Sequence, residues 1–145
     1  MLERSMPTRH RLLPLNEKRI DIRWRDLDAF GHVNQAVYQT YGEELVDAWF
    51  REVLGLGDGE VWDYVVVRLT TDYRSELRLA DGQVTGTVRV VRLGRSSVTL
   101  ALELRAASDG RVVAETEVVF ACWDGEKRAA RPISDDERAK LEAAA

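Results

Sequence analysis

A single long helical pattern, followed only by strand patterns, limits the folds open to this chain of 145 residues. Seven residues recur at the spacing of one helix face, with Trp49 at its edge: Ala36, Val37, Thr40, Tyr41, Glu44, Leu45 and Ala48. Asn34 suits the N-cap because its side chain accepts a backbone N–H of the first turn. The pattern predicts a helix of about 18 residues that ends near Val53.

Strand patterns surround this helix. Residues 18–25 alternate, with Ile20, Ile22 and Trp24 on one face. Further strands are predicted at residues 61–69, 83–93, 96–107 and 111–123, and residues 72–80 continue the first of these or form a bent connection. Turn signals stand at Asp81-Gly82, Gly94-Arg95 and Asp109-Gly110. The order predicts an α+β fold in which a long helix packs on a curved antiparallel sheet of about five strands.

The chain length predicts one domain, which we place at residues 17–133. Residues 1–16 are expected to form a flexible N-terminal segment. Ser134 and Glu137 form a capping box for a short C-terminal helix over residues 134–145. Because the alanine-rich end of this helix has little apolar face, we expect it to be peripheral.

Composition narrows the partners and the compartment. The formal net charge is −4, so general attraction to nucleic acid is not expected. No apolar run approaches the length of a membrane span, and we expect no membrane partner. Cys122 is the single cysteine, which excludes an intrachain disulfide and fits a cytoplasmic protein.

Polar residues concentrate between the first strand and the helix, at Asp26, Asp28, Gly31, His32 and Asn34. A carboxylate at Asp28 can face a pocket beside the helix N-terminus, where free N–H groups polarise a carbonyl oxygen. Asp28 then serves as a nucleophile or as a general base. The alternative is that these residues only cap the helix and shape the turn.

His32 has three interpretations: a catalytic residue, a metal ligand beside an aspartate, or a turn residue. The chain has only two histidines, without the spacing of a metal motif, so no metal site is predicted. No phosphate-binding loop, dinucleotide fingerprint or nucleophile elbow is present, and no cofactor is expected.

The stretch RWRDLDAFGHVNQAVYQTYGEE resembles the signature of the 4-hydroxybenzoyl-CoA thioesterase-like group of the hotdog-fold superfamily. The matching residues are Asp26, Asp28, Gly31, His32, Val33, Asn34 and Tyr38. Glu43 falls where many members carry glutamate. The strands and turns that follow fit the family layout, and the resemblance covers roughly residues 17 to 133.

The resemblance implies a fold, an assembly and a chemistry. The family wraps a long helix in an antiparallel sheet, pairs subunits edge to edge, and often forms homotetramers from homodimers. Asp28 matches the catalytic carboxylate. The Gln35 backbone N–H matches the group that polarises the thioester carbonyl, and Gly31 shapes the turn. Some members carry histidine at the position of Gln35, so a catalytic role does not transfer to His32.

The implied function is an acyl-CoA thioesterase that releases a free acid and coenzyme A. Arg92, Arg95 and Ser96 are the candidate contacts for the coenzyme A phosphates, with His32 and Asn34 as further substrate-binding residues. Arg74 and Ser75 are weaker candidates. Trp62, Tyr64 and residues 55–60 are candidates for the acyl end, but the sequence does not place them.

Two alternatives remain at this point. One is a module on the same fold that binds acyl-CoA or an acyl-carrier protein without catalysis. The other is a dehydratase of this fold, whose usual aspartate–histidine signature is absent. The acyl group, and the choice between coenzyme A and an acyl-carrier protein, stay open.

Overall fold

The computed structural model describes residues 17–145, so the predicted flexible segment 1–16 lies outside the described residues. The elements follow in chain order: β1 (Glu17–Asp21), η1 (Trp24–Asp26), α2 (Gln35–Leu54), β2 (Tyr64–Tyr73), η2 (Leu79–Asp81), β3 (Gln83–Leu93), β4 (Ser97–Ala106), β5 (Val112–Asp124), β6 (Ala129–Ala130) and α3 (Asp135–Ala143). The predicted helix and strands are all present, with shifted ends.

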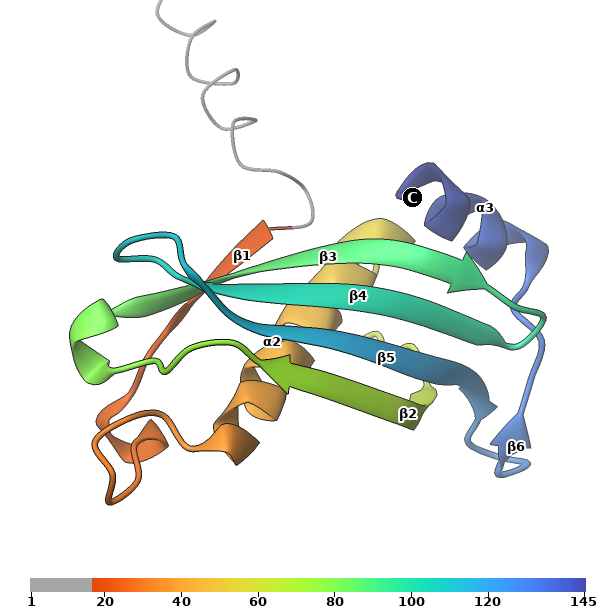
Figure 1. Cartoon of the computed structure of the whole chain (residues 1–145). Helices are drawn as coiled ribbons and strands as arrows, with labels where there is room; N and C mark the ends of the chain where they lie inside the picture. Colours follow the sequence, from red (N-terminus) through yellow and green to blue (C-terminus); the bar gives the residue numbers. More distant parts are fainter. Residues whose placement is uncertain (1–16) are drawn as a thin grey trace, which may run out of the picture.

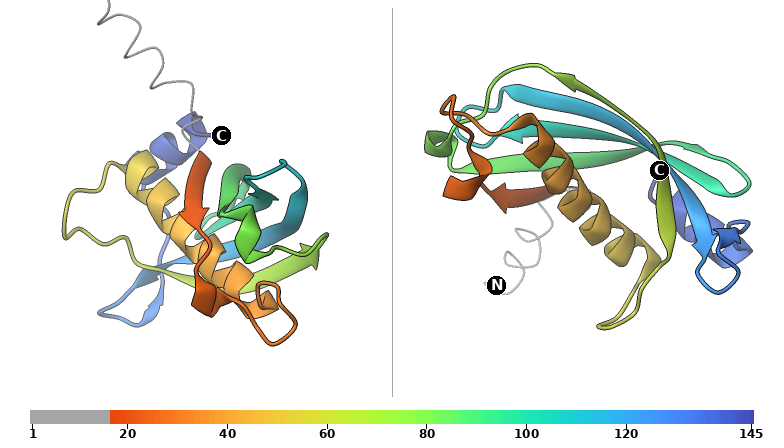
Figure 2. Two further views of the ribbon diagram at one scale, coloured as in Figure 1. Left: turned by 90° about the vertical axis from the view of Figure 1, so that its left-hand side faces the viewer. Right: turned by 90° about the horizontal axis from the view of Figure 1, so that it is seen from below.

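The strands form one antiparallel sheet in the order β1-β3-β4-β5-β2, and the two-residue β6 pairs with β5. The sheet curves, and α2 lies along one of its faces (Figures 1 and 2). This arrangement confirms the predicted fold of a long helix on a curved antiparallel sheet. Among residues 17–145, β1 and β2 are the two edges of the sheet, and no strand of this range lies on the outer side of β2.

The buried face of α2 differs from the predicted one. Tyr41, Leu45 and Trp49 are buried as expected, but Ala36, Thr40 and Glu44 are exposed. Four residues at the same spacing on the adjacent face of the helix are buried instead: Tyr38, Gly42, Val46 and Phe50. The reason is the gain in apolar area, since burying large side chains stabilises the fold more than burying alanine or threonine.

A glycine on the sheet lets the helix approach it closely. A Cβ at Gly86 of β3 would lie 2.7 Å from Leu45, and one at Gly42 of α2 would lie 3.4 Å from Leu102 of β4. The first distance is too short for a side chain to be tolerated without movement of Leu45. α2 therefore sits close above β3 and β4.

The first strand is shorter than predicted. β1 ends at Asp21, and the backbone turns into η1, where Trp24 is 79% exposed instead of packing beside Ile20 and Ile22. The turn is fixed because the Arg23 N–H donates to the Asp26 carboxylate over 3.0 Å. A period-two pattern does not reveal this side-chain contact, which overrides the alternation.

The C-terminal helix is not peripheral. Its capping box forms as predicted, but Leu141 is completely buried. Lys140 donates to the Leu54 carbonyl at the end of α2, and Arg138 donates to the Gly94 carbonyl over 2.7 Å. Although α3 has a narrow apolar face, the single leucine on it fills a site against α2, so α3 belongs to the same core.

Candidate active site

The segment between η1 and α2 forms a tight loop around Gly31. Leu27 and Val33 form a β-bridge that closes it. Inside the bridge, the Asp28 N–H donates to the His32 carbonyl over 3.1 Å, and the Gly31 N–H donates to the Asp28 carbonyl over 3.2 Å. Gly31 has a φ of +84°, which glycine adopts without the steric cost of a Cβ. The loop therefore holds Asp28 at the base of α2.

Two donors orient the Asp28 carboxylate. Oδ1 accepts the Phe30 N–H over 2.9 Å, and Oδ2 accepts the Asn34 side-chain amide over 3.2 Å. The Asn34 Oδ1 in turn accepts the Ala36 N–H over 2.9 Å. One asparagine thus caps α2, as predicted, and also binds the carboxylate. The Asp28 side chain keeps 19% of its surface exposed, so a substrate can reach it.

The first turn of α2 offers one amide for a substrate. Ala36 and Val37 donate their N–H groups to Asn34. The Gln35 N–H has no acceptor among residues 17–145. A free N–H at a helix N-terminus combines a donor with the positive end of the helix dipole. This amide follows Asn34 directly, and Asn34 is the residue that holds Asp28.

Asp26 is buried beneath the loop, with 3% of its surface exposed. Its Oδ2 accepts the Tyr41 hydroxyl over 2.7 Å and the Arg23 N–H over 3.0 Å. Burial alone would raise the pKa of Asp26, but these hydrogen bonds and the Arg23 guanidinium lower it below its ordinary value. Its carbonyl accepts the Asn34 N–H over 3.0 Å. Asp26 is therefore an ionised anchor for the loop, and sequence reasoning missed its link to Tyr41.

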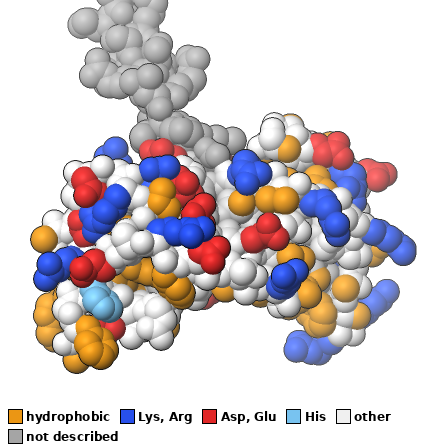
Figure 3. All heavy atoms as spheres, viewed as in Figure 1, with side chains coloured by type: hydrophobic (Ala, Val, Ile, Leu, Met, Phe, Trp, Pro, Cys, Tyr) orange, Lys and Arg blue, Asp and Glu red, His pale blue; other side chains and the backbone are white. Residues whose placement is uncertain are grey.

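His32 lies at the rim of the loop, with its side chain 37% exposed. Its Nδ1 is 3.2 Å from the Val33 carbonyl and 3.9 Å from Asp28 Oδ1. The ring stacks on Phe30 with centroids 6.1 Å apart, and Figure 3 shows hydrophobic side chains gathered beside the imidazole. His32 is close enough to contact a substrate at Asp28, but it does not donate a hydrogen bond to that carboxylate at this distance.

The candidate phosphate contacts lie far from Asp28 in the same chain. Arg92, Arg95 and Ser96 are at the β3–β4 turn, whereas the opposite end of β3 pairs with the end of β1 that leads into the site loop (Figure 1). The length of β3 separates these ends by about 33 Å, at roughly 3.3 Å per residue. One chain does not bring the two groups together.

The weaker candidates already have partners within the chain. Arg74 Nε donates to Glu115 over 2.7 Å, and the Ser75 hydroxyl donates to the Val112 carbonyl over 2.8 Å. A phosphate would therefore have to compete with these existing hydrogen bonds for either side chain.

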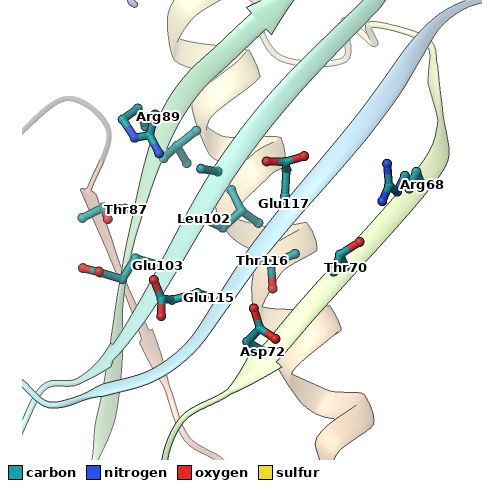
Figure 4. A pocket seen from close by; sticks show the side chains of 12 residues that line it. Arg68, Thr70, Asp72, Thr87, Arg89, Leu102, Glu103, Glu115, Thr116 and Glu117 are labelled. Carbon is teal, nitrogen blue, oxygen red and sulfur yellow. The ribbon is translucent and has the colours of Figure 1, made fainter.

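A large hollow is on the face of the sheet turned away from α2 (Figure 4). Its volume is about 710 Å³. Four carboxylates and two guanidinium groups line it: Asp72, Glu103, Glu115, Glu117, Arg68 and Arg89. The acidic excess disfavours phosphates, and the charged lining disfavours an acyl chain. This hollow therefore suits neither part of an acyl-CoA.

A smaller cavity of about 80 Å³ lies between α2 and the strands β2 and β5. Its lining is mostly apolar: Gly42, Val46, Tyr64, Val66, Leu69, Leu102, Val118 and Phe120, with Gln39, Glu43 and Thr116 as the polar members. It begins at Gln39, one helical turn from Gln35. The cavity therefore follows the side of α2 that faces β2, from Gln39 to Val46.

A chain of hydrogen bonds crosses the start of this cavity. The Tyr73 hydroxyl donates to the Gln35 carbonyl over 3.1 Å, and Gln39 Nε2 donates to Thr71 over 3.1 Å. These bonds tie the first turns of α2 to the edge strand β2. They were not predicted, because they join residues more than 30 positions apart.

Two kinds of site are not found in the described part of the chain. No cluster of three or more His, Cys, Asp or Glu side chains within residues 17–145 has the arrangement needed to hold a metal ion. No helix within this range is long and apolar enough to cross a membrane.

Comparison with known proteins identifies the family. A family model of the Thioesterase-like superfamily matches residues 22–141. The long-chain acyl-CoA thioesterase FadM of Escherichia coli (strain K12) is 30% identical over 132 residues, covering 87% of this chain and 96% of that protein.

Solved structures agree with this match. A thioesterase from Thermus thermophilus, in complex with coenzyme A and zinc, has a TM-score of 0.77 at 32% identity and covers 90% of this chain and 94% of its own. A predicted thioesterase from Bacillus stearothermophilus shares the fold, with a TM-score of 0.78 at 24% identity and coverage of 88% and 94%. The resemblance in the sequence is confirmed, and the chain belongs to the Thioesterase-like superfamily.

Proposed function

We propose that this protein hydrolyses acyl-CoA thioesters at Asp28 and the N-terminus of α2. The observation that carries the proposal is that Asn34, which orients the carboxylate of Asp28, directly precedes Gln35, whose N–H has no acceptor among residues 17–145. The names of the Escherichia coli and Thermus thermophilus relatives support acyl-CoA as the substrate and coenzyme A as the thiol carrier.

The chemistry follows from these two groups. The thioester carbonyl oxygen accepts the Gln35 N–H, which stabilises the negative charge that develops on it. Asp28 attacks the carbonyl carbon, or removes a proton from a water molecule that attacks it. If Asp28 attacks, the carbon–sulfur bond breaks to leave an acyl anhydride on Asp28, which a water molecule then hydrolyses to restore the carboxylate. If water attacks, the same bond breaks directly. In both cases water supplies the oxygen of the carboxylic acid and the proton that the departing thiolate takes up to become the thiol of coenzyme A. Asn34 donates the hydrogen bond that orients Asp28, and His32 contacts the bound substrate at the rim of the site.

The acyl group enters the cavity between α2 and β2. This cavity starts one turn from Gln35 and is mostly apolar, and its volume of about 80 Å³ suits the first carbons of an acyl chain whose carbonyl is held at the helix N-terminus. The acidic hollow on the other face of the sheet offers no such match.

A second subunit supplies the phosphate contacts in this proposal. The free edge β2 exposes Val66, Val67 and Leu69 by 53%, 64% and 44%, which is typical of an edge that pairs with another strand. Tyr73 lies at the end of β2 beside the site. If two copies of β2 pair antiparallel, the β3–β4 turn of the partner comes to that end.

In such a homodimer, the partner subunit's Arg92, the partner subunit's Arg95 and the partner subunit's Ser96 face the substrate. The homotetramer implied by the resemblance joins two of these dimers. In solution the protein is therefore expected at twice or four times the 16.5 kDa of one chain. Val67→Lys, which places a charge on the pairing edge, is expected to give monomers with little activity. A fully active monomer would refute the shared site.

The decisive test is Asp28→Asn, which keeps the shape of the side chain and removes its charge. Release of free thiol from a panel of acyl-CoAs is followed with a thiol reagent. We expect a fall in kcat of about 100-fold or more, which is typical for loss of a catalytic acid or base. His32→Ala is the comparison and is expected to keep most of kcat. Wild-type turnover in Asp28→Asn would show that the site is wrongly assigned.

The proposed compartment is the cytoplasm. Cys122 is buried and has no disulfide partner, and burial raises the pKa of its thiol. A buried neutral thiol is compatible with a reducing compartment.

A further inference from the structure

Tyr73 lies on the surface, yet its hydroxyl makes two hydrogen bonds within the chain. It is the last residue of β2, and 47% of its surface is exposed. The hydroxyl donates to the Gln35 carbonyl over 3.1 Å and accepts from Gln39 Nε2 over 3.3 Å. The ring packs against Tyr38, with centroids 5.2 Å apart. Because water can satisfy a half-exposed hydroxyl, these bonds add little to the stability of the fold.

Gln35, the first residue of α2, is held on its two sides by different parts of the molecule. On the N-terminal side, the Asn34 N–H donates to the Asp26 carbonyl over 3.0 Å, and the Asn34 side chain donates to Asp28 over 3.2 Å. On the C-terminal side, the Gln35 carbonyl accepts the Tyr73 hydroxyl from the sheet. The direction of the Gln35 N–H therefore depends on the loop and on the sheet together.

The contact with Tyr73 differs from the other contact between β2 and the start of α2. Thr71 accepts Gln39 Nε2 over 3.1 Å, which holds a side chain in the second turn of the helix. Within residues 17–145, Tyr73 is the one side chain of the sheet that bonds to the backbone of the first turn. The first turn is the part of a helix that frays most easily, because its N–H groups have no acceptors within the helix.

We propose that Tyr73 is a positioning residue for thioester hydrolysis: by holding the Gln35 carbonyl, it sets the direction of the Gln35 N–H. The inference rests on the proposed function, because it takes this N–H as the donor to the thioester oxygen. Such a donor lowers the barrier only where it points at the place of the developing charge. A first turn that shifts still permits substrate binding but stabilises this charge less. Tyr73 therefore acts on kcat and not on KM.

The test is Tyr73→Phe, which removes the hydroxyl and keeps the ring against Tyr38. Release of free thiol from the acyl-CoA panel gives kcat and KM. We expect kcat to fall about tenfold, which is less than the loss of about 100-fold or more on removal of an oxyanion donor, because the Gln35 N–H is still present. KM is expected to stay within about twofold of the wild type. The fall is expected to be equal for every acyl chain, since all share the carbonyl.

Thr71→Val is the matched control. Thr71 is two positions before Tyr73 on the same face of β2, and the substitution also removes one hydroxyl that bonds to Gln39. The bond between Tyr73 and the Gln35 carbonyl stays in place. We expect kcat within about threefold of the wild type. If Thr71→Val lowers kcat as much as Tyr73→Phe does, any attachment of α2 to β2 has the same effect, and the role assigned to Tyr73 is wrong.

Two further measurements separate positioning from a loss of structure. The melting temperature of Tyr73→Phe is expected within about 3 °C of the wild type, as for most surface substitutions. The mass in solution is expected to be unchanged, because the hydroxyl is bonded to α2 and not to the outer edge of β2. If the mass falls to that of one chain, the loss of kcat reports a lost partner, and the positioning role fails.

The outcomes also separate this inference from the proposed function. If Asp28→Asn abolishes turnover but Tyr73→Phe keeps the wild-type kcat, the site is right and the role of Tyr73 is wrong. If Tyr73→Phe raises KM with kcat unchanged, or if its effect grows with the acyl chain, Tyr73 contacts the substrate directly, which also overturns the positioning role. If Asp28→Asn keeps wild-type turnover, the proposed function itself fails.

Discussion

The buried pair of Tyr41 and Asp26 gives the sharpest test of how the loop is held. Tyr41 is completely buried, Asp26 is 3% exposed, and the hydroxyl donates to the carboxylate over 2.7 Å. Tyr41→Phe removes that donor and leaves an ionised carboxylate with one hydrogen bond fewer. Hydrogen bonds to charged groups contribute about 1.5–3 kcal/mol, so we expect the free energy of unfolding to fall by about 2 kcal/mol.

Urea unfolding measured at several pH values is the assay. The folded-state pKa of Asp26 is lowered below 3.8. A lowered pKa gives stability that is present above the unfolded-state value and lost as the pH falls through the folded-state value. Tyr41 contributes to this lowering, so the difference between the wild type and Tyr41→Phe is expected to be full at pH 7 and to shrink below about pH 4. At neutral pH the melting temperature is expected to fall by about 6 °C.

Tyr38→Phe is the matched control on the same helix. Tyr38 is 5% exposed, and its hydroxyl is near the neutral backbone of Leu77. Its loss is expected to cost about 1 kcal/mol at every pH. If Tyr41→Phe costs no more than Tyr38→Phe, or if its cost is the same at pH 7 and pH 3, then Asp26 is not the ionised anchor described above.

Three further predictions concern other contacts. Leu141→Ala is expected to lower the free energy of unfolding by about 3 kcal/mol in urea, because Leu141 is completely buried, whereas a cost below 1 kcal/mol would mean that α3 contributes little. Hydrogen bonds from Arg131 lower the pKa of Glu137 from 4.5 to about 2, so the stability that this carboxylate contributes is present above pH 4.5 and lost as the pH falls toward 2. Unfolding of Glu137→Gln is therefore expected to differ from the wild type by about 1–2 kcal/mol at pH 7 and to coincide with it at pH 2. Asn34→Asp keeps an N-cap but places a carboxylate against Asp28, so kcat in the thioester assay is expected to fall at least tenfold with stability nearly unchanged; unaltered kcat would mean that Asn34 serves only as a cap.

Local patterns in the sequence predicted much of the fold. The N-cap at Asn34, the capping box at Ser134 and the turn at Asp109-Gly110 each depend on residues a few positions apart, and all three form. The face of α2 was predicted less well, because periodicity treats every position on a face alike. Glu44 has the spacing of a core residue but is exposed, whereas Phe50, which the pattern did not place on that face, is buried.

The part of the candidate site that could be predicted is likewise the part whose residues are close together in the sequence. Asp28 and Gln35 are seven residues apart in a segment with a strand before it and a helix after it, so the sequence alone places them together. Arg92 has no such relation to Asp28, because their separation depends on the order of the strands and on the direction of β3. A contact with substrate at Arg92 depends on a second chain, which no periodicity in one chain describes.

The loop geometry also shows why a local motif needs a distant anchor. The hydrogen bonds that the described residues make to the Asp28 carboxylate come from within six positions of it, and they hold the carboxylate only relative to the loop. The loop itself is fixed through Asp26, whose side chain is bound by Tyr41 two turns along α2 and whose carbonyl binds Asn34. Because Tyr41 is in the helix core, the packing of α2 on the sheet determines where Asp28 stands relative to the Gln35 amide. A substitution in the core that shifts α2 along β3 is therefore expected to lower kcat before it unfolds the protein.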